Sequence, residues 1–420
     1  MALVGLGEAQ AHVLQRCPPL TPADVHIRHA LGLVAAEEVR ASDAVPPFAN
    51  TAMDGFAVRS ADTAQAPVVL RVTGTVAAGS VTPVAPVGAG EAVRIMTGAP
   101  MPEGADAVVM VERTSPAGEG RVRIEAAAAP GDHVRPAGDD LRPGTVLVEP
   151  GTVLTPGHLG VLASAGVARI SAVPRPRVGV LSTGDELVDV DDAGPLRPGA
   201  IRDSNRHTLL ALLQWGGYDG VDLGLAPDDE DLIASRLSRG LADCDAVLTS
   251  GGVSVGDFDY MKAVLDRLTA GSMRWMQVAI RPAKPFAFGA VGDKPVFGLP
   301  GNPVSSMVSF AVLAAPGLRS LAGHTQPLPP TVTALADDEI GPAPLDRTDL
   351  VRVVLTAGAE GALHVRSAGR QQSHLLGVMA HANGLAVIPP GGRAAVGTPV
   401  PVIPLGPPEV PDPSGRRLAW

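Results

Sequence analysis

Aromatic side chains are scarce in this chain, at 3% of its 420 residues. Proteins that bind single-stranded nucleic acid without sequence preference stack bases on aromatic rings, so that mode of binding has little to work with. Positive charge is also in deficit, since 33 Lys and Arg face 43 Asp and Glu and the net charge is −10. An acidic protein is repelled by phosphate backbones and by anionic membrane surfaces. We therefore expect neither a nucleic acid nor a membrane as a partner.

Cysteine is almost absent, and the two that occur, Cys17 and Cys244, lie too far apart for a metal or redox motif. The first ten residues lack the basic segment and the full apolar stretch of a secretion signal. No apolar run reaches the ~18 residues that a membrane-spanning helix needs. These absences predict a soluble, cytoplasmic protein in a reducing compartment.

Hydrophobic residues, in contrast, make up 45% of the chain, and its 49 glycines and 41 prolines are spread between apolar runs. This composition indicates a globular protein with many turns and much β structure. Because single cores stop growing near ~250–300 residues, 420 residues predict several domains.

The N-terminal part has helical periodicity over residues 5–40, with Thr21 and Pro22 as the start of a second helix. Alternating apolar residues and glycine turns then predict a β-rich module over 43–139. A short helix is expected at Pro156–Ala165. We predict a mixed N-terminal domain, residues 1–42 and 140–170, interrupted by the β module.

Residues 171–322 alternate between strand and helix patterns, which predicts a parallel sheet with helices on both faces. The expected strands are Val178–Leu181, Val221–Leu225, the apolar run after Asp245, Val278–Ile280 and Val296–Leu299. The expected helices follow Asp203 or Ser204, cover Asp228–Arg239, follow Asp257, and cover Pro303–Leu313.

Strand patterns return after Pro327–Pro330, at Leu350–Leu355, Ala362–Val365, Gly384–Ile388 and Val400–Val402. They predict a small C-terminal β domain over 323–408. The fold class expected for the whole chain is therefore α/β plus β, in several domains, with the parallel α/β domain at its centre.

Four polar loops of the α/β domain are expected to follow strands: Ser182–Glu186, Ser250–Asp259, Arg281–Pro285 and Gly298–Ser306. Carboxyl ends of parallel strands meet at one edge of a sheet, so the four loops should converge. Together they offer hydroxyls, backbone N–H groups, acids and two cations. This mixture favours an anionic substrate held with a divalent cation.

Two plainer interpretations stay open at this point. Gly252–Gly256 also fits the G-x-S-x-G pattern of a serine nucleophile, although Ser254 comes five residues after Thr249 and an elbow serine follows its strand directly. On residue chemistry alone, the polar segment around Asp54 and Gly55 is better explained by a turn between two strands.

Six motifs in this order resemble the MoeA-type molybdopterin molybdenumtransferases, a family that includes the E domain of gephyrin: AMDGFAV, RIMTGAPMPEGADAVVMVE, STGDEL, SGGVSVGDFDY, KPFAFG and GLPGNPVS. The resemblance covers roughly the whole chain. It implies insertion of molybdate into adenylylated molybdopterin in a Mg²⁺-dependent step that releases AMP and molybdenum cofactor. It also implies an elongated homodimer with its site between protomers, and a possible handover of substrate from a molybdopterin adenylyltransferase.

The resemblance assigns roles to residues at matching positions. Catalytic roles fall on Asp54, Thr97, Asp140, Glu186 and Asp259, with Glu186 and Asp259 linked to Mg²⁺. Residues expected to bind the pterin substrate are Ser182, Thr183, Gly184, Ser250, Gly251, Gly252, Ser254, Gly256, Pro300, Gly301, Asn302 and Pro303. Residues expected to hold molybdate or another oxyanion are Arg281, Lys284, Ser305, Arg352 and Ser373.

This sequence departs from the family pattern at two places. Arg281 stands where many members have lysine, and a guanidinium forks whereas an ammonium is a point charge. Phe56 replaces the usual tyrosine after Asp54 and Gly55. The rival from another class is a molybdopterin-binding scaffold without turnover, and the presence of Asp259, Glu186 and Lys284 argues against it.

Overall fold

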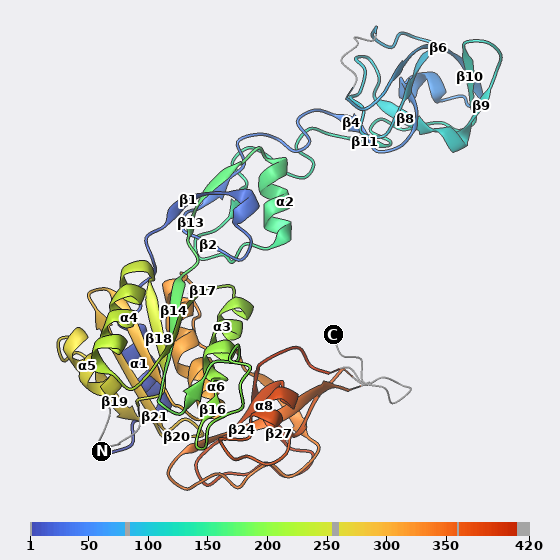
Figure 1. Ribbon diagram of the computed structural model, residues 1–420. Helices are drawn as coiled ribbons and strands as arrows, with labels where there is room; N and C mark the ends of the chain where they lie inside the picture. The colour runs from blue at the N-terminus through green and yellow to red at the C-terminus, as the bar shows by residue number, and fades with distance from the viewer. Residues whose placement is uncertain (1, 80–84, 254–259, 359–360, 410–420) are drawn as a thin grey trace. The chain divides into compact units, whose positions relative to one another are not determined.

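The computed structural model describes residues 2–79, 85–253, 260–358 and 361–409 (Figure 1). Internal contacts divide the chain into two compact units. Unit 1 comprises Met1–Ala23, Gly32–Ala36 and Val173–Trp420, and unit 2 comprises Asp24–Leu31 and Glu37–Ala172. The four domain boundaries drawn from the sequence stay a prediction.

Unit 1 is built on a six-stranded sheet with the order β17-β14-β18-β22-β21-β19. The strands are β14 (Arg177–Thr183), β17 (Asp219–Ala226), β18 (Ala246–Ser250), β19 (Arg274–Gln277), β21 (Pro285–Val291) and β22 (Lys294–Leu299). The first four strands of the order run parallel, as predicted, whereas β21 and β19 run antiparallel to their neighbours. The sequence interpretation missed β21 because no helical pattern separates it from β22.

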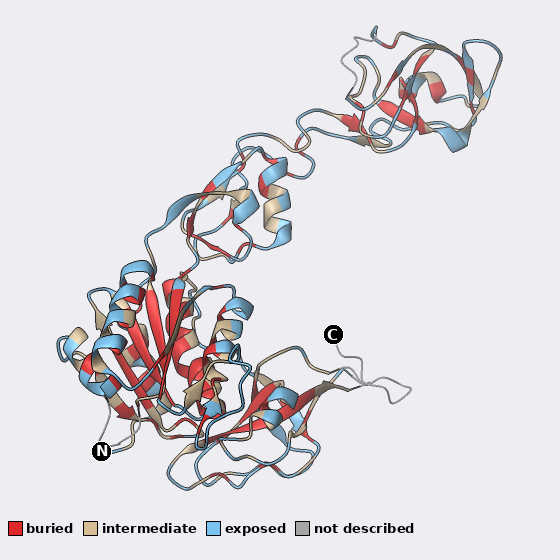
Figure 2. Ribbon diagram, viewed as in Figure 1, coloured by how far each residue is buried: buried red, intermediate tan, exposed pale blue. Residues whose placement is uncertain are grey.

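Helices cover both faces of this sheet, whose central strands β14, β18 and β22 are buried, whereas the edge strands β17 and β19 are partly exposed (Figure 2). The helices are α1 (Leu6–Leu14), α3 (Asn205–Trp215), α4 (Glu230–Asp243), α5 (Tyr260–Leu268), α6 (Pro303–Ser309) and α7 (Ala315–Leu321), with the π-helical turn η4 (Phe310–Ala314) joining the last two. Alternate residues of β14 and β18 point to opposite sides: Val180 and Leu248 pack with α1, α3 and α6, while Leu181 and Val247 pack with α4 and α5. Burying each such side chain stabilises the fold by about 1.5–3 kcal/mol.

The helical run Pro303–Leu321 is long and apolar enough to cross a membrane by length and composition alone. However, 72% of its apolar window is buried inside the protein, and Val304, Val308 and Leu318 belong to the core of the α/β sheet. The apolar character of this helix is therefore explained by packing within unit 1.

The C-terminal part of unit 1 forms a second six-stranded sheet with the order β20-β24-β25-β23-β27-β26. Its elements are β20 (Ile280–Arg281), β23 (Val332–Ala336), β24 (Thr348–Ala357), β25 (Leu363–Ser367), α8 (Leu376–His381), β26 (Gly384–Ile388) and β27 (Pro399–Pro404). An additional pairing of β24 with β26 closes the sheet on itself as a barrel. The four predicted strands are all present, and β20 joins them from the α/β segment by pairing with β24.

Three short strands complete unit 1, namely β2 (Val34–Ala35), β15 (Leu187–Val188) and β16 (Ile201–Arg202). β15 and β16 pair with each other.

Unit 2 contains a six-stranded sheet with the order β8-β5-β7-β6-β10-β9. These strands are β5 (Gly55–Val58), β6 (Val68–Val76), β7 (Glu91–Ile95), β8 (Ala107–Met110), β9 (Thr114–Pro116) and β10 (Arg121–Ile124). Phe56 and Val58 face one apolar cluster and Ala57 faces another, so both sides of β5 are buried. The β-rich character predicted for this region is confirmed.

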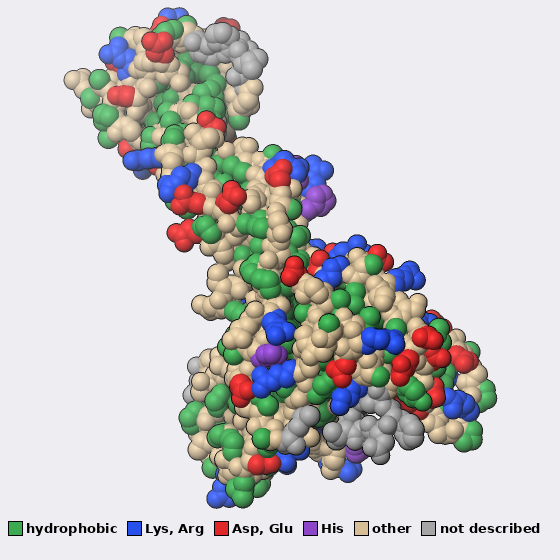
Figure 3. Space-filling model, turned by 90° about the vertical axis from the view of Figure 1, so that its left-hand side faces the viewer, with side chains coloured by type: hydrophobic (Ala, Val, Ile, Leu, Met, Phe, Trp, Pro, Cys, Tyr) green, Lys and Arg blue, Asp and Glu red, His purple; other side chains and the backbone are tan. Residues whose placement is uncertain are grey.

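Within its described residues, the rest of unit 2 consists of short elements and one α-helix. They are β1 (Ala23–His26), η1 (Ile27–His29), β3 (Val39–Arg40), β4 (Asn50–Thr51), η2 (Ser60–Thr63), η3 (Val111–Arg113), β11 (Val134–Arg135), β12 (Val146–Val148), α2 (Pro156–Ser164) and β13 (Arg169–Val173). The predicted helix α2 begins after Thr155, whose hydroxyl accepts the amide of His158. On the face drawn in Figure 3, acidic and basic side chains are interspersed.

The helix predicted from Thr21 onward is wrong. Residues 23–35 form β1, η1 and β2 instead. The amide of Ile27 donates to the carbonyl of Ala168, and Gly32 takes a φ of 78° that ends any regular helix. Strand pairing with a segment far along the chain therefore overrides the local periodicity. The predicted first helix is present as α1, which packs against α7 in unit 1.

Two glycine substitutions in unit 2 test the close packing of β5. An ideal Cβ on Gly55 would lie 2.0 Å from the carbonyl oxygen of Val109 in β8, whereas a Cβ on Gly160 in α2 meets nothing within 4 Å. We expect Gly55→Ala to destabilise unit 2 by about 2–3 kcal/mol because backbone must move. Gly160→Ala should stabilise it by about 0.5–1 kcal/mol. Calorimetric unfolding of the full chain measures both, and equal effects would contradict the packing argument.

Candidate active site

Three of the predicted loops meet at the carboxyl edge of the α/β sheet. β14, β18 and β22 are parallel neighbours, and Ser182 lies beside Ser250, which in turn lies beside Leu299. The chain leaves each strand near this level, so the loops that begin at Gly184, Gly251 and Pro300 start side by side. Ser182, Thr183 and Ser250 are buried at their bases.

The turn after β18 requires glycine. Gly251 has a φ of 97°, and an ideal Cβ there would lie 2.8 Å from the carbonyl oxygen of Thr183. Its amide donates to the carbonyl of Leu299 at 3.2 Å, which joins this turn to the loop after β22. Gly252 also has positive φ. Ser254, Gly256, Asp257 and Asp259 lie outside the described residues, so the roles expected for Ser254, Gly256 and Asp259 stay predictions.

The loop after β22 leads directly into α6. Pro303 is its first helical residue, and the carbonyl of Asn302 accepts the amide of Ser306 at 2.9 Å. Ser305 is buried in the first turn. Predicted substrate residues Pro300–Pro303 therefore form the connection between a buried strand and a helix start.

One residue at this edge was missed from the sequence. Asn205, the first residue of α3, donates through Nδ2 to the hydroxyl of Ser250 and to the carbonyl of Gly301, both at 2.7 Å. The only available signal was the Asp203–Asn205 segment before a helix, and it was interpreted as a cap alone. A side-chain amide in that position can bind polar groups of different strands, which sequence spacing does not show.

An acidic group lies beside the loop after β14. The amide of Asp228, after β17, donates to the carboxylate of Asp185 at 3.1 Å. Burial raises the pKa of Asp228, and the negative charges of Asp185 and Glu186 raise it further. Glu186 lies against Gly184, with its carboxylate 2.5 Å from an ideal Cβ on that glycine. Asp185 and Asp228 were not among the predicted site residues.

Glu186 could provide one ligand to a Mg²⁺ ion, but the described residues do not form a complete set of protein ligands around it. Within the described residues there is no group of three His, Cys, Asp or Glu placed to hold a metal. Mg²⁺ usually takes one or two carboxylates and completes its shell with water and substrate phosphate. The mutual repulsion of Asp185, Glu186 and Asp228 is the kind of excess charge that a divalent cation relieves.

The fourth loop reaches the same edge for a different reason from the predicted one. Arg281–Pro285 connects β20 to β21 instead of following a parallel strand of the α/β sheet, and β21 is antiparallel to β22 with Ala287 opposite Gly298. The start of β21 therefore lies beside the end of β22. Arg281 is held in β20, where it forks onto both oxygens of Asp349, with Nε 2.9 Å from Oδ1. This bond raises the pKa of Arg281.

Lys284 follows in the same loop and is half-buried. Its backbone carbonyl accepts the amide of Val278 at 2.6 Å, which fixes the chain on either side of the turn. Its charge acts on Asp346, whose pKa is lowered chiefly by a hydrogen bond from Arg347 and to a lesser degree by Lys284. The ammonium group of Lys284 makes no hydrogen bond or ion pair with a described residue, and it acts on Asp346 through its charge alone.

Arg352 is fully buried in β24 without a carboxylate directly bound to it among the described residues. Its two terminal nitrogens donate to the carbonyls of Gln372, at 3.2 Å, and Arg370, at 3.1 Å. Its Nε has no partner in the described structure. Burial lowers its pKa. A buried guanidinium with an unused N–H is unusual, because buried polar groups are normally hydrogen-bonded.

Ser373 follows Arg370 and Gln372, whose carbonyls accept hydrogen bonds from Arg352. The carbonyl of Ser373 accepts the amide of Val304 at 3.3 Å, in the first turn of α6 beside Ser305. The barrel loop and the start of α6 are thus joined. Of the five residues expected to hold an oxyanion, the structure brings Ser305, Ser373 and the loop shaped by Arg352 together.

In unit 2 the expected residues Asp54 and Thr97 form a hydrogen-bonded pair. Oδ1 of Asp54 accepts both the amide and the hydroxyl of Thr97, each at 2.7 Å. The side-chain bond from Thr97, followed by its backbone bond, lowers the pKa of Asp54. Asp140 lies on an exposed turn, where its amide donates to Val45, and its side chain has no bond to a described residue.

The departure at Phe56 has a simple structural explanation. Its ring is buried in the apolar cluster of unit 2, at 7% exposure, and the guanidinium of Arg94 lies 5.7 Å from the ring centre. A tyrosine hydroxyl is not required for that packing.

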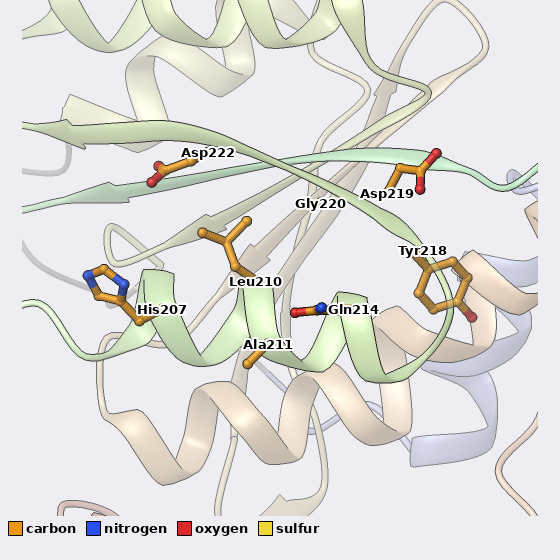
Figure 4. A pocket seen from close by; sticks show the side chains of 8 residues that line it. All are labelled: His207, Leu210, Ala211, Gln214, Tyr218, Asp219, Gly220 and Asp222. Carbon is orange, nitrogen blue, oxygen red and sulfur yellow. The ribbon is translucent and has the colours of Figure 1, made fainter.

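A cavity of about 570 Å³ lies elsewhere on unit 1, between α3 and β17 (Figure 4). Its lining includes His207, Gln214 and Tyr218. Burial raises the pKa of Tyr218 to about 12. The cavity follows the N-terminal half of β17, which is the half away from the site loops. None of the predicted site residues lines this cavity.

Comparisons with known proteins cover almost the whole chain. Three family models match in order: the MoeA N-terminal region (domains I and II) over residues 4–166, a probable molybdopterin binding domain over 179–320, and the MoeA C-terminal region (domain IV) over 340–405.

Relatives of known name and structure agree with these matches. The molybdopterin molybdenumtransferase of Haemophilus influenzae is 37% identical over 389 residues, which cover 92% of this chain and 94% of that protein. Molybdopterin molybdenumtransferase 2 of Mycobacterium tuberculosis is also 37% identical over 389 residues, covering 90% and 93%. A crystal structure of a molybdopterin biosynthesis MoeA protein from Pyrococcus horikoshii has a TM-score of 0.78 at 30% identity, covering 97% and 100%. The predicted fold class is confirmed.

Substitution of Thr97 tests the Asp54–Thr97 pair. Thr97→Val removes the hydroxyl donor, so the pKa of Asp54 should rise toward the ordinary aspartate value, whereas Thr97→Ser should keep it low. Since the folded-state pKa is depressed, the bond's contribution to stability is present above the ordinary carboxyl range and is lost as pH falls through the lowered pKa. Carboxyl ¹³C titration by NMR measures this pKa. The same value in both variants would mean that the hydroxyl has no effect.

Proposed function

The chain belongs to the MoeA family of molybdopterin molybdenumtransferases, and from this we propose that it inserts molybdate into adenylylated molybdopterin, with release of AMP, to give molybdenum cofactor. The observation that carries the proposal is the sheet edge where Ser182, Ser250 and Gly251 lie between an acidic group and a cationic one. Adenylylated molybdopterin and molybdate are both anionic, and the edge offers donors and charge for each.

The phosphoanhydride of the substrate is assigned to the centre of the edge. Buried hydroxyls and the backbone of the turn at Gly251 provide fixed hydrogen-bond groups that need no rearrangement when a diphosphate binds. Cleaving a phosphoanhydride depends on positioning and on neutralising charge more than on a nucleophilic side chain. This is why Ser254 is assigned to binding, and why a serine-hydrolase function is not proposed.

The acidic side of the edge is assigned to the metal. Glu186, with Asp259, would hold Mg²⁺ next to the phosphates, and Asp185 and Asp228 would add to the local negative charge. A bound Mg²⁺ would supply charge neutralisation for the leaving AMP.

The cationic side is assigned to molybdate. Lys284 supplies an ammonium with no carboxylate bound to it among described residues. Ser305 and Ser373, whose segments are joined by the bond from the Val304 amide to the Ser373 carbonyl, would supply hydroxyls. Arg352 donates hydrogen bonds to carbonyls of the loop that carries Ser373, and its Nε–H has no partner in the described structure. Arg281 contributes charge at this end, but its fork is already engaged by Asp349, so Lys284 is the principal cation of the proposal.

The remaining parts of the proposal follow the family. The protein would act as a cytoplasmic homodimer in which Asp54, Thr97 and Asp140 complete the site of the other protomer. The ordered, ionised carboxylate of Asp54 supports such a polar role. Its substrate would come from a molybdopterin adenylyltransferase, since adenylylated molybdopterin has to be made by a separate adenylyl transfer.

The test is AMP release by the purified protein supplied with adenylylated molybdopterin, molybdate and Mg²⁺. Wild type should release AMP, and Lys284→Gln should raise the molybdate concentration for half-maximal rate by roughly 10- to 100-fold, the effect of losing a hydrogen bond from a charged group. Lys294→Gln is the matched control: that lysine begins β22, at the other end of the strand, and bonds to the carbonyl of Leu241.

Two results would overturn the proposal. Substrate binding without AMP release in wild type would favour a scaffold that has lost turnover. An equal molybdate dependence in the Lys284 and Lys294 variants would remove Lys284 from the oxyanion site.

A further inference from the structure

We propose that Asn205 and Arg206, in the first turn of α3, are positioning residues that hold the three site loops at a fixed spacing. This inference rests on the proposed function for its catalytic consequence, but its structural content does not. Neither residue belongs to the substrate-binding, acidic or oxyanion groups described above.

Asn205 joins the loops after β18 and β22. The two hydrogens of its Nδ2 account for its two bonds, one to the hydroxyl of Ser250 and one to the carbonyl of Gly301. Ser250 ends β18 and Gly301 lies in the turn after β22. The clearest other bond between the turns that follow these two strands runs from the amide of Gly251 to the carbonyl of Leu299. Asn205 therefore determines how far apart the two turns lie and how the hydroxyl of Ser250 is oriented.

Arg206 connects the third loop to the same helical turn. Its guanidinium, in a residue only 4% exposed, contacts the carboxylates of Asp203, Asp222 and Asp189. The remaining oxygen of Asp203 accepts the hydroxyl of Ser182 at 3.1 Å and the amide of Arg206 at 3.2 Å. The chain of bonds thus runs from Arg206 through Asp203 to the end of β14.

The contact with Asp189 extends this control to the acidic loop. Asp189 follows β15 directly, three residues after Glu186. The same loop is held by Arg202, which donates to the carbonyls of Asp189 and Gly194, and by Arg197 on the carbonyl of Asp185. Of these three arginines, Arg206 connects the loop to the sheet, because it binds both Asp189 in the loop and Asp222 in β17.

The charge balance explains why an arginine is needed. One guanidinium faces three carboxylates from three parts of the chain, and removing it would leave partly buried negative charges uncompensated. Burial opposes the charge of Arg206, but the bond with Asp203 and the charges of Asp222 and Asp189 prevail and its pKa is raised. Lysine keeps the charge but has no planar fork with which to reach all three.

A fixed spacing matters because a reacting group displaced by ~1 Å can lose ~100-fold in rate. The clamp formed by Asn205 and Arg206 acts through Ser182, Ser250 and Gly301, so its loss should alter both substrate affinity and turnover. A residue that contributes to stability alone would alter neither at temperatures where the protein stays folded.

The deciding experiment compares Asn205→Ala with Ser204→Ala in the full-length protein. Ser204 occupies the same turn, but its side chain makes no capping bond. In Asn205→Ala, affinity for AMP measured by calorimetry should fall about tenfold, the effect of losing one or two hydrogen bonds. Hydrogen exchange should quicken in residues 182–187, 250–252 and 299–302, while Tm changes by less than about 3 °C. Ser204→Ala should match wild type in all three measurements.

Arg206→Lys and Arg206→Leu extend the test to the third loop. Exchange at 182–187 should quicken in both variants, and kcat should fall while KM rises, less in Arg206→Lys than in Arg206→Leu. Unchanged exchange and AMP affinity in Asn205→Ala would overturn the proposal, as would a Tm loss large enough to account for them. If wild type releases no AMP, the proposed function fails, yet the exchange difference between Asn205→Ala and Ser204→Ala still decides whether the clamp exists.

Discussion

The parallel pairing of β14, β18 and β22 is the constraint on which the rest of the candidate site depends. It places Ser182, Ser250 and Leu299 in one row, and every loop that leaves this row begins at the same level. Apolar side chains on both faces of these strands, such as Val180 and Leu181, keep the row in register because a slip of one residue would exchange the two faces. The site therefore rests on the core, while its specificity rests on the loops.

The polar groups around this row are held mainly by bonds between distant segments. Asn205 bridges two loops, Asp203 holds Ser182, and Ser373 of the barrel contacts the start of α6. Such bonds orient groups before a ligand arrives, which lowers the cost of ordering them on binding. The same arrangement separates acids on the β14 and β17 side from cations on the β21 and barrel side, which suits a substrate with two anionic ends.

Among the buried polar atoms of unit 1 that lack a partner in the described structure, some belong to or adjoin residues expected to bind a ligand, including Arg352 itself and Thr249 next to Ser250. The hydroxyl of Thr249 and Nε of Arg352 have no partner in the described part of the structure. Natural folds rarely leave such groups without a partner. Arg281 shows the opposite case, since its carboxylate partner Asp349 satisfies it within the fold. Of the two arginines expected at the oxyanion site, the buried one is thus the less satisfied.

The sequence by itself determined the fold class, most helices, the parallel strands of the α/β sheet and four strands of the C-terminal domain, because apolar periodicity and glycine turns are local properties. It predicted which loops carry the chemistry. It also indicated Gly251, where backbone conformation excludes a side chain. Tertiary structure alone decided what depends on distant partners: that residues 23–35 are strands and turns, that β21 runs antiparallel, and that Arg281 binds Asp349. The role of Asn205 belongs to this second group, because a side chain that joins two loops is recognisable only when both are in place.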